Sequence, residues 1–210
     1  MPELPLCSLD NAGHFGHSGR VGSGVIPSGS MVLVMAAERV SYEDIDQYTY
    51  SGIRSVLAVA FADDDGDDGG LADFSDFDHW FIVRREGRVV AVTGLLHRTV
   101  IVNSSTPVEV AALGGVATVL EHQNRGLATH LVNEAVGFGF AEHRTRFALL
   151  QCLPNLVPFY ESRGWRPLDV RLLCLQADGG TYTSPEVPMV FEEVPGTWPL
   201  GPIDMNGLPW

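Results

Sequence analysis

The most constraining feature of this sequence is a loop that joins an apolar run to a helical pattern. The apolar run covers residues 108–119, and the helical pattern runs from Gly126 to about Glu142. Glycine and alanine at 126 and 128 allow the backbone to approach an anion closely. The unpaired N–H groups of a helix's first turn face that anion with roughly half a positive charge. The segment therefore predicts a cradle for a pyrophosphate group. It lacks the Gly-Lys-Ser/Thr of a P-loop and the GxGxxG of a dinucleotide site, which disfavours a kinase or a dehydrogenase.

Composition and charge narrow the class of protein further. Of the 210 residues, 45% are hydrophobic and 19% charged, as in a globular domain. No apolar run reaches the roughly eighteen residues of a membrane span, and no secretory signal is visible, so we expect a cytoplasmic protein. An odd number of cysteines without CxxC spacing predicts reduced thiols: Cys7, Cys152 and Cys174. The net charge of −13 disfavours nucleic acid and membrane partners and favours cationic ligands, although solubility alone also explains it.

Hydrophobic periodicity predicts one α+β (mixed α/β) domain over residues 31–195. Ser41 is the expected N-cap of the first helix, with Asp44 in the capping-box position, and that helix should bury Tyr48 and end near Phe61. Glu86–Arg88 is a hairpin signal. The expected elements alternate as strand, helix, three strands, helix, strand, helix and two strands: 31–40, 41–61, 80–85, 89–102, 108–119, 126–142, 147–153, 154–163, 170–175 and 187–194.

Three segments outside these elements have unusual composition. Residues 1–30 are predicted to be a flexible arm, in which His14 and His17 are too few to form a metal site. Residues 63–78 are an aspartate-rich loop, either a solvated linker or a negative rim for a polycationic substrate. Residues 196–210 form a tail rich in proline and glycine.

Two motifs resemble those of the GNAT N-acetyltransferases over residues 35–175. Gln123-x-x-Gly126-x-Ala128 is similar to the Q/R-x-x-G-x-G/A signature, and Gly115–Thr118 resembles the coenzyme-binding strand before it. Asn155 through Phe159–Trp165 is similar to the segment that ends the domain. The resemblance implies a central, mixed, mostly antiparallel sheet flanked by helices. It also implies direct transfer of acetyl from acetyl-CoA to a primary amine.

The resemblance assigns roles to particular residues. The backbone of Val116 and Thr118 would pair with the pantetheine arm, and Asn155 would cap its short helix or contact coenzyme A. Tyr160 would donate a proton to the departing thiolate, which stabilises the leaving group. The pyrophosphate would be held by the Thr129 hydroxyl and by backbone N–H groups of Gln123, Asn124, Arg125, Gly126, Leu127 and Ala128.

Cys152 ends a predicted strand near the expected thioester. An acyl-cysteine intermediate needs a thiolate and a partnered base. No histidine lies near Cys152 in sequence. We therefore expect Cys152 to be a buried core residue.

A closer resemblance is to the aminoglycoside 2'-N-acetyltransferases, in His79–Gly87, Phe159–Trp165 and the tail that ends at Trp210. It implies that this tail covers the acceptor cleft, that Trp210 and Asp204 bind the cationic amine, and that the protein is a homodimer. Where those enzymes carry a glutamate before the coenzyme strand, this chain has Gly114.

The amine must nevertheless lose a proton before it attacks. Bulk water, Asp204, the Trp210 carboxylate and His97 remain alternative acceptors of that proton, and sugar amines titrate near pH 8. Two other functions also stay open: a GNAT acetyltransferase for another small amine, and a degenerate acyl-CoA-binding sensor.

Overall fold

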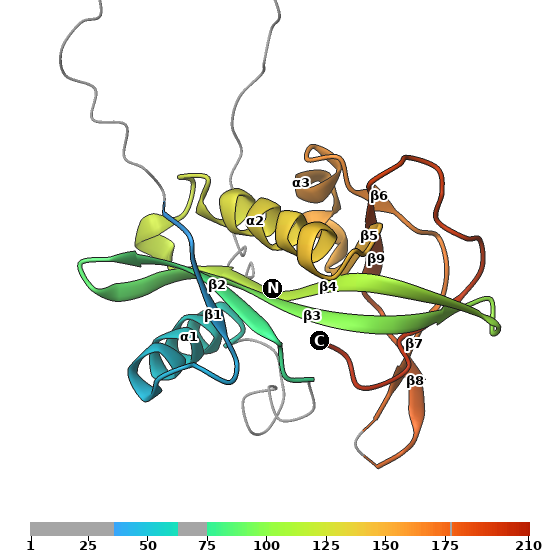
Figure 1. The fold of residues 1–210 in the computed structure, drawn as a ribbon, viewed down its shortest axis with the longest axis horizontal. Helices are drawn as coiled ribbons and strands as arrows, with labels where there is room; N and C mark the ends of the chain where they lie inside the picture. The colour runs from blue at the N-terminus through green and yellow to red at the C-terminus, as the bar shows by residue number, and fades with distance from the viewer. Residues whose placement is uncertain (1–35, 63–74, 177) are drawn as a thin grey trace, which may run out of the picture.

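The computed structural model describes residues 36–62, 75–176 and 178–210, which form a curled ten-stranded mixed sheet with helices on both faces (Figure 1). The sheet order is β6-β9-β5-β4-β3-β10-β7-β8, and β2, which also pairs with β1, joins the edge of β3. The helices and 3-10 turns are α1 (Gln47–Ala60), η1 (Leu120–His122), α2 (Leu127–Glu142), η2 (Pro154–Leu156) and α3 (Val157–Glu161). The strands are β1 (Glu38–Ser41), β2 (His79–Arg85), β3 (Arg88–Val102), β4 (Thr106–Thr118), β5 (Phe147–Cys152), β6 (Arg166–Pro167), β7 (Leu172–Leu175), β8 (Thr181–Thr183), β9 (Val187–Glu192) and β10 (Ile203–Asp204).

The sheet separates two buried clusters, one under each helical layer. Leu131 of α2 and Leu113 of β4 belong to one cluster, which α3 joins. Ile53 of α1 and Ala112 of β4 belong to the other. Successive β4 residues thus face opposite layers, as the period of two in a strand requires. Figure 1 shows α2 on one face of the sheet and α1 on the other.

Two long hairpins build the centre of the sheet, as the sequence predicts. Glu86 and Gly87 adopt positive φ angles of 50° and 78°, which the tight turn between β2 and β3 requires. Asn103 and Ser104 have φ angles of 51° and 60° at the next turn, which leads into β4. The expected runs 80–85, 89–102 and 108–119 match β2, β3 and β4 within two residues.

The start of α1 differs from the prediction. Asp46, and not Ser41, is the N-cap, because its carboxylate accepts a hydrogen bond of 2.9 Å from the Thr49 backbone N–H. Ser41 instead donates to Asp44 at 2.6 Å, before the helix begins. Tyr48, expected on the buried face, is 65% exposed. The helix therefore begins five residues later than predicted, although its end near Phe61 is confirmed.

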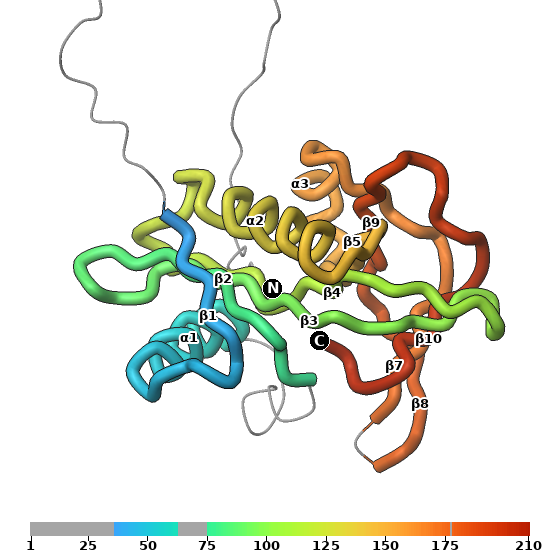
Figure 2. The backbone as a smooth tube through the Cα atoms, viewed as in Figure 1, coloured from blue at the N-terminus to red at the C-terminus, as the bar shows by residue number. Residues whose placement is uncertain are grey.

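Two residues of the C-terminal segment join the sheet. Strand β10 lies between the end of β3 and β7, with Asp204 opposite Ile101 and Leu173. Met205 is fully buried. The backbone path in Figure 2 then turns back along β3 toward the middle of the sheet. Sequence periodicity missed β6, β8 and β10 because each has only two or three residues.

Several sequence predictions fall outside the described residues. These are the arm at 1–30 with His14 and His17, Cys7, and the aspartate-rich loop as far as residue 74. Within the described ranges, no helix combines the length and the apolar character that crossing a bilayer requires.

Candidate active site

Strands β4 and β5 pair for only two residues and then separate. Ala111 lies opposite Ala148 and Ala112 opposite Leu149, in parallel register. Beyond that point β4 continues to Thr118 and β5 to Cys152 without further pairing between them. The backbone groups of β4 that face this opening can therefore pair with an inserted extended chain, as an added strand would.

A bulge in β4 accounts for the separation. The pairs Val92–Ala117 and Gly94–Gly114 leave Gly115 and Val116 opposite the single residue Thr93. Gly115 has φ +58°, the left-handed conformation of a bulge glycine. Such a bulge bends its strand and increases the local twist.

Thr118 gives an independent indication that the opening accepts a ligand. The residue is 8% exposed, and its Oγ1 has no hydrogen-bond partner among the described residues. Val116 packs against the cluster under α2 and Ala117 against the one under α1, so alternation places Thr118 on the α2 side. A buried hydroxyl without a partner is costly, and a polar group of the inserted chain would satisfy it.

The predicted anion loop lies directly between β4 and α2. The Gln123 side-chain amide donates to the Thr118 carbonyl at 3.1 Å, which ties the loop to the end of the strand. Gly126 is the N-cap of α2 with φ 75°, and α2 has no acidic residue in its first turn. The first turn of a helix carries N–H groups without intrahelical partners, an arrangement that attracts anions such as a diphosphate. These are the residues, from Gln123 to Thr129, that the sequence selects.

Tyr160 lies on α3, in the same buried cluster as Leu113 of β4 and Cys152 of β5. It is 3% exposed, and its ring makes edge contacts with Phe159 and Trp165. Gly164, at φ 87°, ends this segment and allows the chain to turn into β6. Tyr160 therefore belongs to the layer that covers the same face of the sheet as α2.

Asn155 and Cys152 flank this region. Asn155 is exposed in η2 and caps neither short helix, because the two N-cap positions are Leu153 and Leu156. Burial raises the pKa of the Cys152 thiol to about 12, and the nearby Glu186 carboxylate adds to the rise. At neutral pH Cys152 is a thiol and not a nucleophile, which confirms the expectation of a buried core residue.

The opposite face of β4 is closed by the C-terminal segment. A Cβ atom on Gly114 would lie 2.8 Å from Phe77 Cζ and 2.9 Å from the backbone carbonyl carbon of Trp210. Trp210 is 4% exposed and Phe77 8%. The space that a glutamate side chain would need at position 114 is therefore occupied by Phe77 and the Trp210 backbone.

Arg98 holds the C-terminal segment in place. Its Nη1 donates to the Leu208 carbonyl at 2.6 Å, and its Nη2 donates to Ser75 Oγ at 2.6 Å. The guanidinium also lies 5.3 Å from the Trp210 ring centroid. Sequence reasoning missed Phe77 and Arg98, because neither belongs to a motif. Arg98 contacts Leu208, 110 positions later, and Phe77 contacts Gly94 and Gly114 on neighbouring strands.

Two predicted acceptor or base residues lie elsewhere. Asp204 pairs with Ile101 of β3. Gly114 pairs with Gly94 of the same strand, seven residues before Ile101. Asp204 therefore lies roughly 23 Å from Gly114, measured along the strand. His97 stacks on His143 at the C-terminal end of α2, with ring centroids 4.8 Å apart. The structure thus brings Trp210 to Gly114 but keeps Asp204 and His97 away from it.

Comparison with known proteins agrees with this geometry. The model of the acetyltransferase (GNAT) domain matches residues 41–168, more than half of the chain. No curated protein matches the sequence significantly.

Solved structures share the fold at low sequence identity. Escherichia coli ElaA superposes with a TM-score of 0.56 at 12% identity, covering 75% of this chain and 99% of its own. An acyl-CoA N-acyltransferase from Pseudomonas aeruginosa has a TM-score of 0.56 at 14% identity, covering 74% and 98%. A GNAT family acetyltransferase from Brucella melitensis, in complex with acetyl-CoA, has a TM-score of 0.55 at 14% identity, covering 80% and 95%. The family match, the GNAT fold and the separated strands lead to one conclusion: this chain belongs to the GNAT acetyltransferases, enzymes that use acetyl-CoA as the acyl donor.

Proposed function

We propose that the chain binds acetyl-CoA from the α2 side of the sheet, binds an amine from the α1 side, and transfers acetyl directly through the opening between β4 and β5. The observation that carries this proposal is the opening between β4 and β5, which begins after the pair Ala112–Leu149 and lies beside the bulge at Gly115–Val116. The backbone of Val116 and Thr118 pairs with the pantetheine arm. Tyr160 protonates the departing thiolate, so that negative charge does not build up on sulfur.

The anion loop positions the thioester. Asn155, exposed at the start of the α3 segment, is available to contact the coenzyme. The diphosphate accepts hydrogen bonds from the Thr129 hydroxyl and from N–H groups of Gln123, Asn124, Arg125, Gly126, Leu127 and Ala128.

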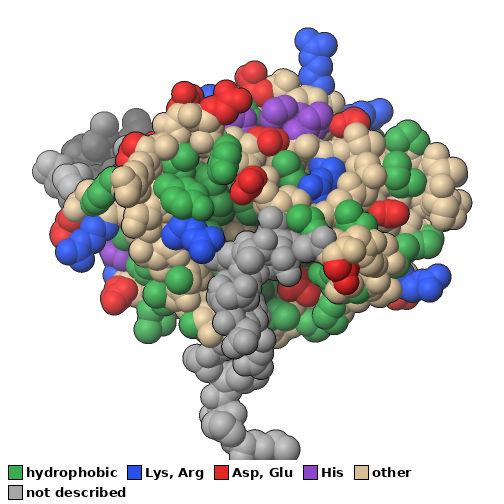
Figure 3. All heavy atoms as spheres, turned by 90° about the horizontal axis from the view of Figure 1, so that it is seen from below, with side chains coloured by type: hydrophobic (Ala, Val, Ile, Leu, Met, Phe, Trp, Pro, Cys, Tyr) green, Lys and Arg blue, Asp and Glu red, His purple; other side chains and the backbone are tan. Residues whose placement is uncertain are grey.

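We propose an aminoglycoside or a similar amino-sugar antibiotic as the acceptor, with resistance as the biological outcome. Three aromatic residues, Phe77, Trp80 and Trp210, belong to the cluster on the α1 side, where they are buried and form the wall beside Gly114. Asp76, beside Phe77, is exposed, and the net charge of −13 attracts a polycation. On the face seen in Figure 3, acidic side chains lie near hydrophobic ones. These features also disfavour nucleic acid and membrane partners.

The reacting amine needs an acceptor for its proton. In this proposal the Trp210 backbone oxygen, beside Gly114, accepts a hydrogen bond from the ammonium group and orients it. Bulk water then takes the proton, because a sugar amine with a pKa of about 8 is partly neutral at physiological pH. Asp204 is too distant to touch this amine, so its proposed role is limited to a distal ammonium of an extended acceptor. We further propose a cytoplasmic homodimer.

Thiol release from acetyl-CoA, measured against a panel of aminoglycosides, polyamines and amino acids, tests the acceptor. Turnover only with aminoglycosides supports the proposal, and turnover only with another amine reassigns the substrate. Coenzyme A binding without turnover on any amine favours the sensor function.

Calorimetric titration of coenzyme A tests the anion loop separately. Gly126→Asp should abolish binding because it places a carboxylate in the anion site. Gly137→Asp is the matched control, since a Cβ atom at Gly137, on α2, meets no atom within 4 Å. Equal coenzyme A affinities of the two variants would contradict the loop assignment.

A further inference from the structure

Arg98 of β3 connects two segments that lie far apart in the sequence. Its Nη1 donates a hydrogen bond of 2.6 Å to the Leu208 carbonyl, and its Nη2 donates one of 2.6 Å to Ser75 Oγ. Val100, two positions later on β3, belongs to the cluster under α1, so the Arg98 side chain lies on that face of the sheet. A single cation thus holds both segments on the α1 side.

The two segments, residues 75–78 and 207–210, are also bonded to each other. The Ser75 N–H donates to the Pro209 carbonyl at 2.7 Å, and Ser75 Oγ donates to the Leu208 carbonyl at 3.1 Å. The Ser75 hydroxyl therefore donates to one carbonyl and accepts from the guanidinium, which joins both segments and β3 at one point.

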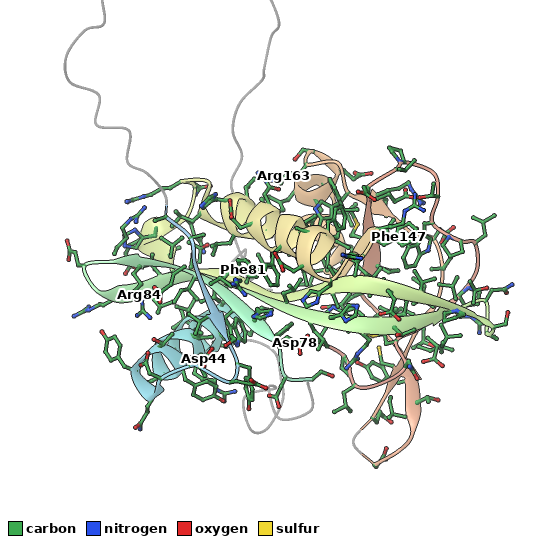
Figure 4. The ribbon with its side chains drawn as sticks, in the orientation of Figure 1. Asp44, Asp78, Phe81, Arg84, Phe147 and Arg163 are labelled. Atoms are coloured by element: carbon green, nitrogen blue, oxygen red, sulfur yellow. The ribbon has the colours of Figure 1, made fainter. Side chains whose placement is uncertain are left out.

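The other end of segment 75–78 is fixed to β3 as well. Asp78, which Figure 4 labels beside the start of β2, accepts a hydrogen bond of 2.7 Å from the His97 backbone N–H. His97 directly precedes Arg98 on β3. Both ends of this segment are thus bonded to neighbouring positions of one strand.

Each residue that Arg98 bonds lies two positions before a group that approaches Gly114. Phe77 follows Ser75 by two residues, and Trp210 follows Leu208 by two. A Cβ atom at Gly114 would lie 2.8 Å from Phe77 Cζ and 2.9 Å from the Trp210 backbone carbonyl carbon. Two residues of chain span at most about 7 Å, so a shift of either bonded residue would move the group beside Gly114.

The energetics of Arg98 favour a role in geometry over a role in stability. Burial lowers the pKa of its guanidinium, and the Asp78 carboxylate partly opposes this shift. Removal of a cation from water costs free energy that its hydrogen bonds offset only in part, so a buried charge adds little net stability. The planar fork of arginine does fix the directions of two hydrogen bonds at once. Arg98 therefore defines the positions of the two segments more than it stabilises the fold.

We infer that Arg98 is a positioning residue for the acceptor amine, which acts through Phe77 and the Trp210 backbone and does not contact the coenzyme. This inference rests on the proposed function, which places the amine on the α1 side beside Gly114 and the coenzyme on the α2 side. Loss of Arg98 should therefore affect the two substrates unequally.

Steady-state kinetics with an aminoglycoside and acetyl-CoA varied in turn test the inference. Arg98→Gln should raise KM for the aminoglycoside about tenfold, the size of a lost hydrogen bond from a charged group, while kcat and KM for acetyl-CoA stay within about twofold. Arg98→Lys should restore part of the affinity, because it keeps the charge without the fork. The matched control is Arg146→Gln, which removes the same charge from an exposed contact of 3.8 Å with Glu193 and should change neither KM more than about twofold.

A double-mutant cycle tests the route through Ser75. Ser75→Ala removes the acceptor of the Arg98 Nη2 hydrogen bond and should itself raise the aminoglycoside KM several-fold. Added to Arg98→Gln, it should raise that KM by no more than about twofold further, because the shared hydrogen bond is already lost. Fully additive effects would contradict the coupling.

Amide hydrogen exchange reports the position of the segments directly. The Ser75 N–H is bonded to the Pro209 carbonyl, so its exchange rate depends on the contact between the segments. Arg98→Gln should speed this exchange about tenfold and leave the amides of α2 unchanged. Faster exchange throughout the described residues would indicate general destabilisation and contradict a positioning role.

The outcomes separate this inference from the proposed function. An unchanged aminoglycoside KM in Arg98→Gln, despite faster exchange at Ser75, would overturn the role of Arg98 and leave the proposed function standing. A rise confined to the acetyl-CoA KM would overturn that role as well. If the thiol-release panel selects another amine, its KM should rise in the same way. Absence of turnover by the wild-type protein on every amine would refute the proposed function itself.

Discussion

Replacement of Gly114 by alanine tests whether the C-terminal segment closes the acceptor side of β4. The added Cβ would lie 2.8 Å from Phe77 Cζ and 2.9 Å from the Trp210 backbone carbon. Carbon atoms prefer a separation of about 3.5–4.0 Å, so these neighbours must move by roughly 0.6 Å or more. The Phe77 ring is buried, and the contact with Trp210 is to backbone, so neither can swing aside freely.

Overpacking of this kind costs about 1–3 kcal/mol. The smaller conformational freedom of alanine in the unfolded chain offsets about 0.5 kcal/mol of that cost. We therefore expect Gly114→Ala to lower the melting temperature by about 2–8 °C. Gly137→Ala is the control, because no atom lies within 4 Å of its added Cβ, and it should stabilise α2 by about 0.5–1 kcal/mol.

The same substitution should change the KM values of the two substrates by different amounts. Displacement of Trp210 should raise KM for the amine acceptor several-fold, whereas KM for acetyl-CoA should stay within about twofold, because the anion loop and α2 lie on the other face of the sheet. Thermal unfolding and steady-state kinetics with each substrate varied provide the measurements. A variant with wild-type stability and an unchanged acceptor KM would refute the contact between Gly114 and Trp210. A rise confined to the acetyl-CoA KM would refute the assignment of the two faces.

Three further predictions concern Tyr160, Cys152 and the histidines at the end of α2. Tyr160→Phe should lower kcat by about 10²–10³-fold, with coenzyme A affinity unchanged by calorimetry; an equal kcat would remove its acid role. Cys152→Ala should keep kcat within about twofold in the same assay, because a thiol with a pKa near 12 is not a nucleophile at pH 7, and abolished turnover in a folded variant would argue for an acyl-cysteine. Burial lowers the pKa values of His79 and His143 below 6.5, with smaller contributions from Arg39 on His79 and from His97 on His143. The unfolded chain then binds more protons, so stability should be constant above about pH 7 and fall as the pH drops below 6.5. Urea unfolding at several pH values measures this slope, which His143→Gln should reduce; an unchanged slope would contradict the role of His143.

The sequence predicted those parts of the structure that a continuous segment encodes. The loop from Gln123 to Thr129 and the helix after it can be recognised from one stretch of sequence. An apolar strand comes first, and a glycine N-cap and an open helix N-terminus follow it. The same holds for the hairpin at Glu86–Gly87, whose turn chemistry is local. Local spacing also explains the error at the start of α1. Ser41 and Asp44 do form the hydrogen bond that their spacing predicts, but the helix begins only at Asp46.

The surroundings of Gly114 were decided by tertiary structure alone. Phe77, Arg98 and Trp210 meet near Gly94 and Gly114 only because β10 inserts beside β3 and turns the chain back along it. A two-residue strand has no periodicity, and it is stabilised by neighbours far away in sequence. The hydrogen bond from Arg163 Nε to Thr129 Oγ1, 34 residues earlier, is another contact that local sequence does not predict. The amino-acid sequence by itself thus determined the family, the sheet hairpins and the start of α2 after Gly126, because these depend on local spacing. The packing of distant segments determined what fills the space beside Gly114, because those contacts form only when the sheet has assembled.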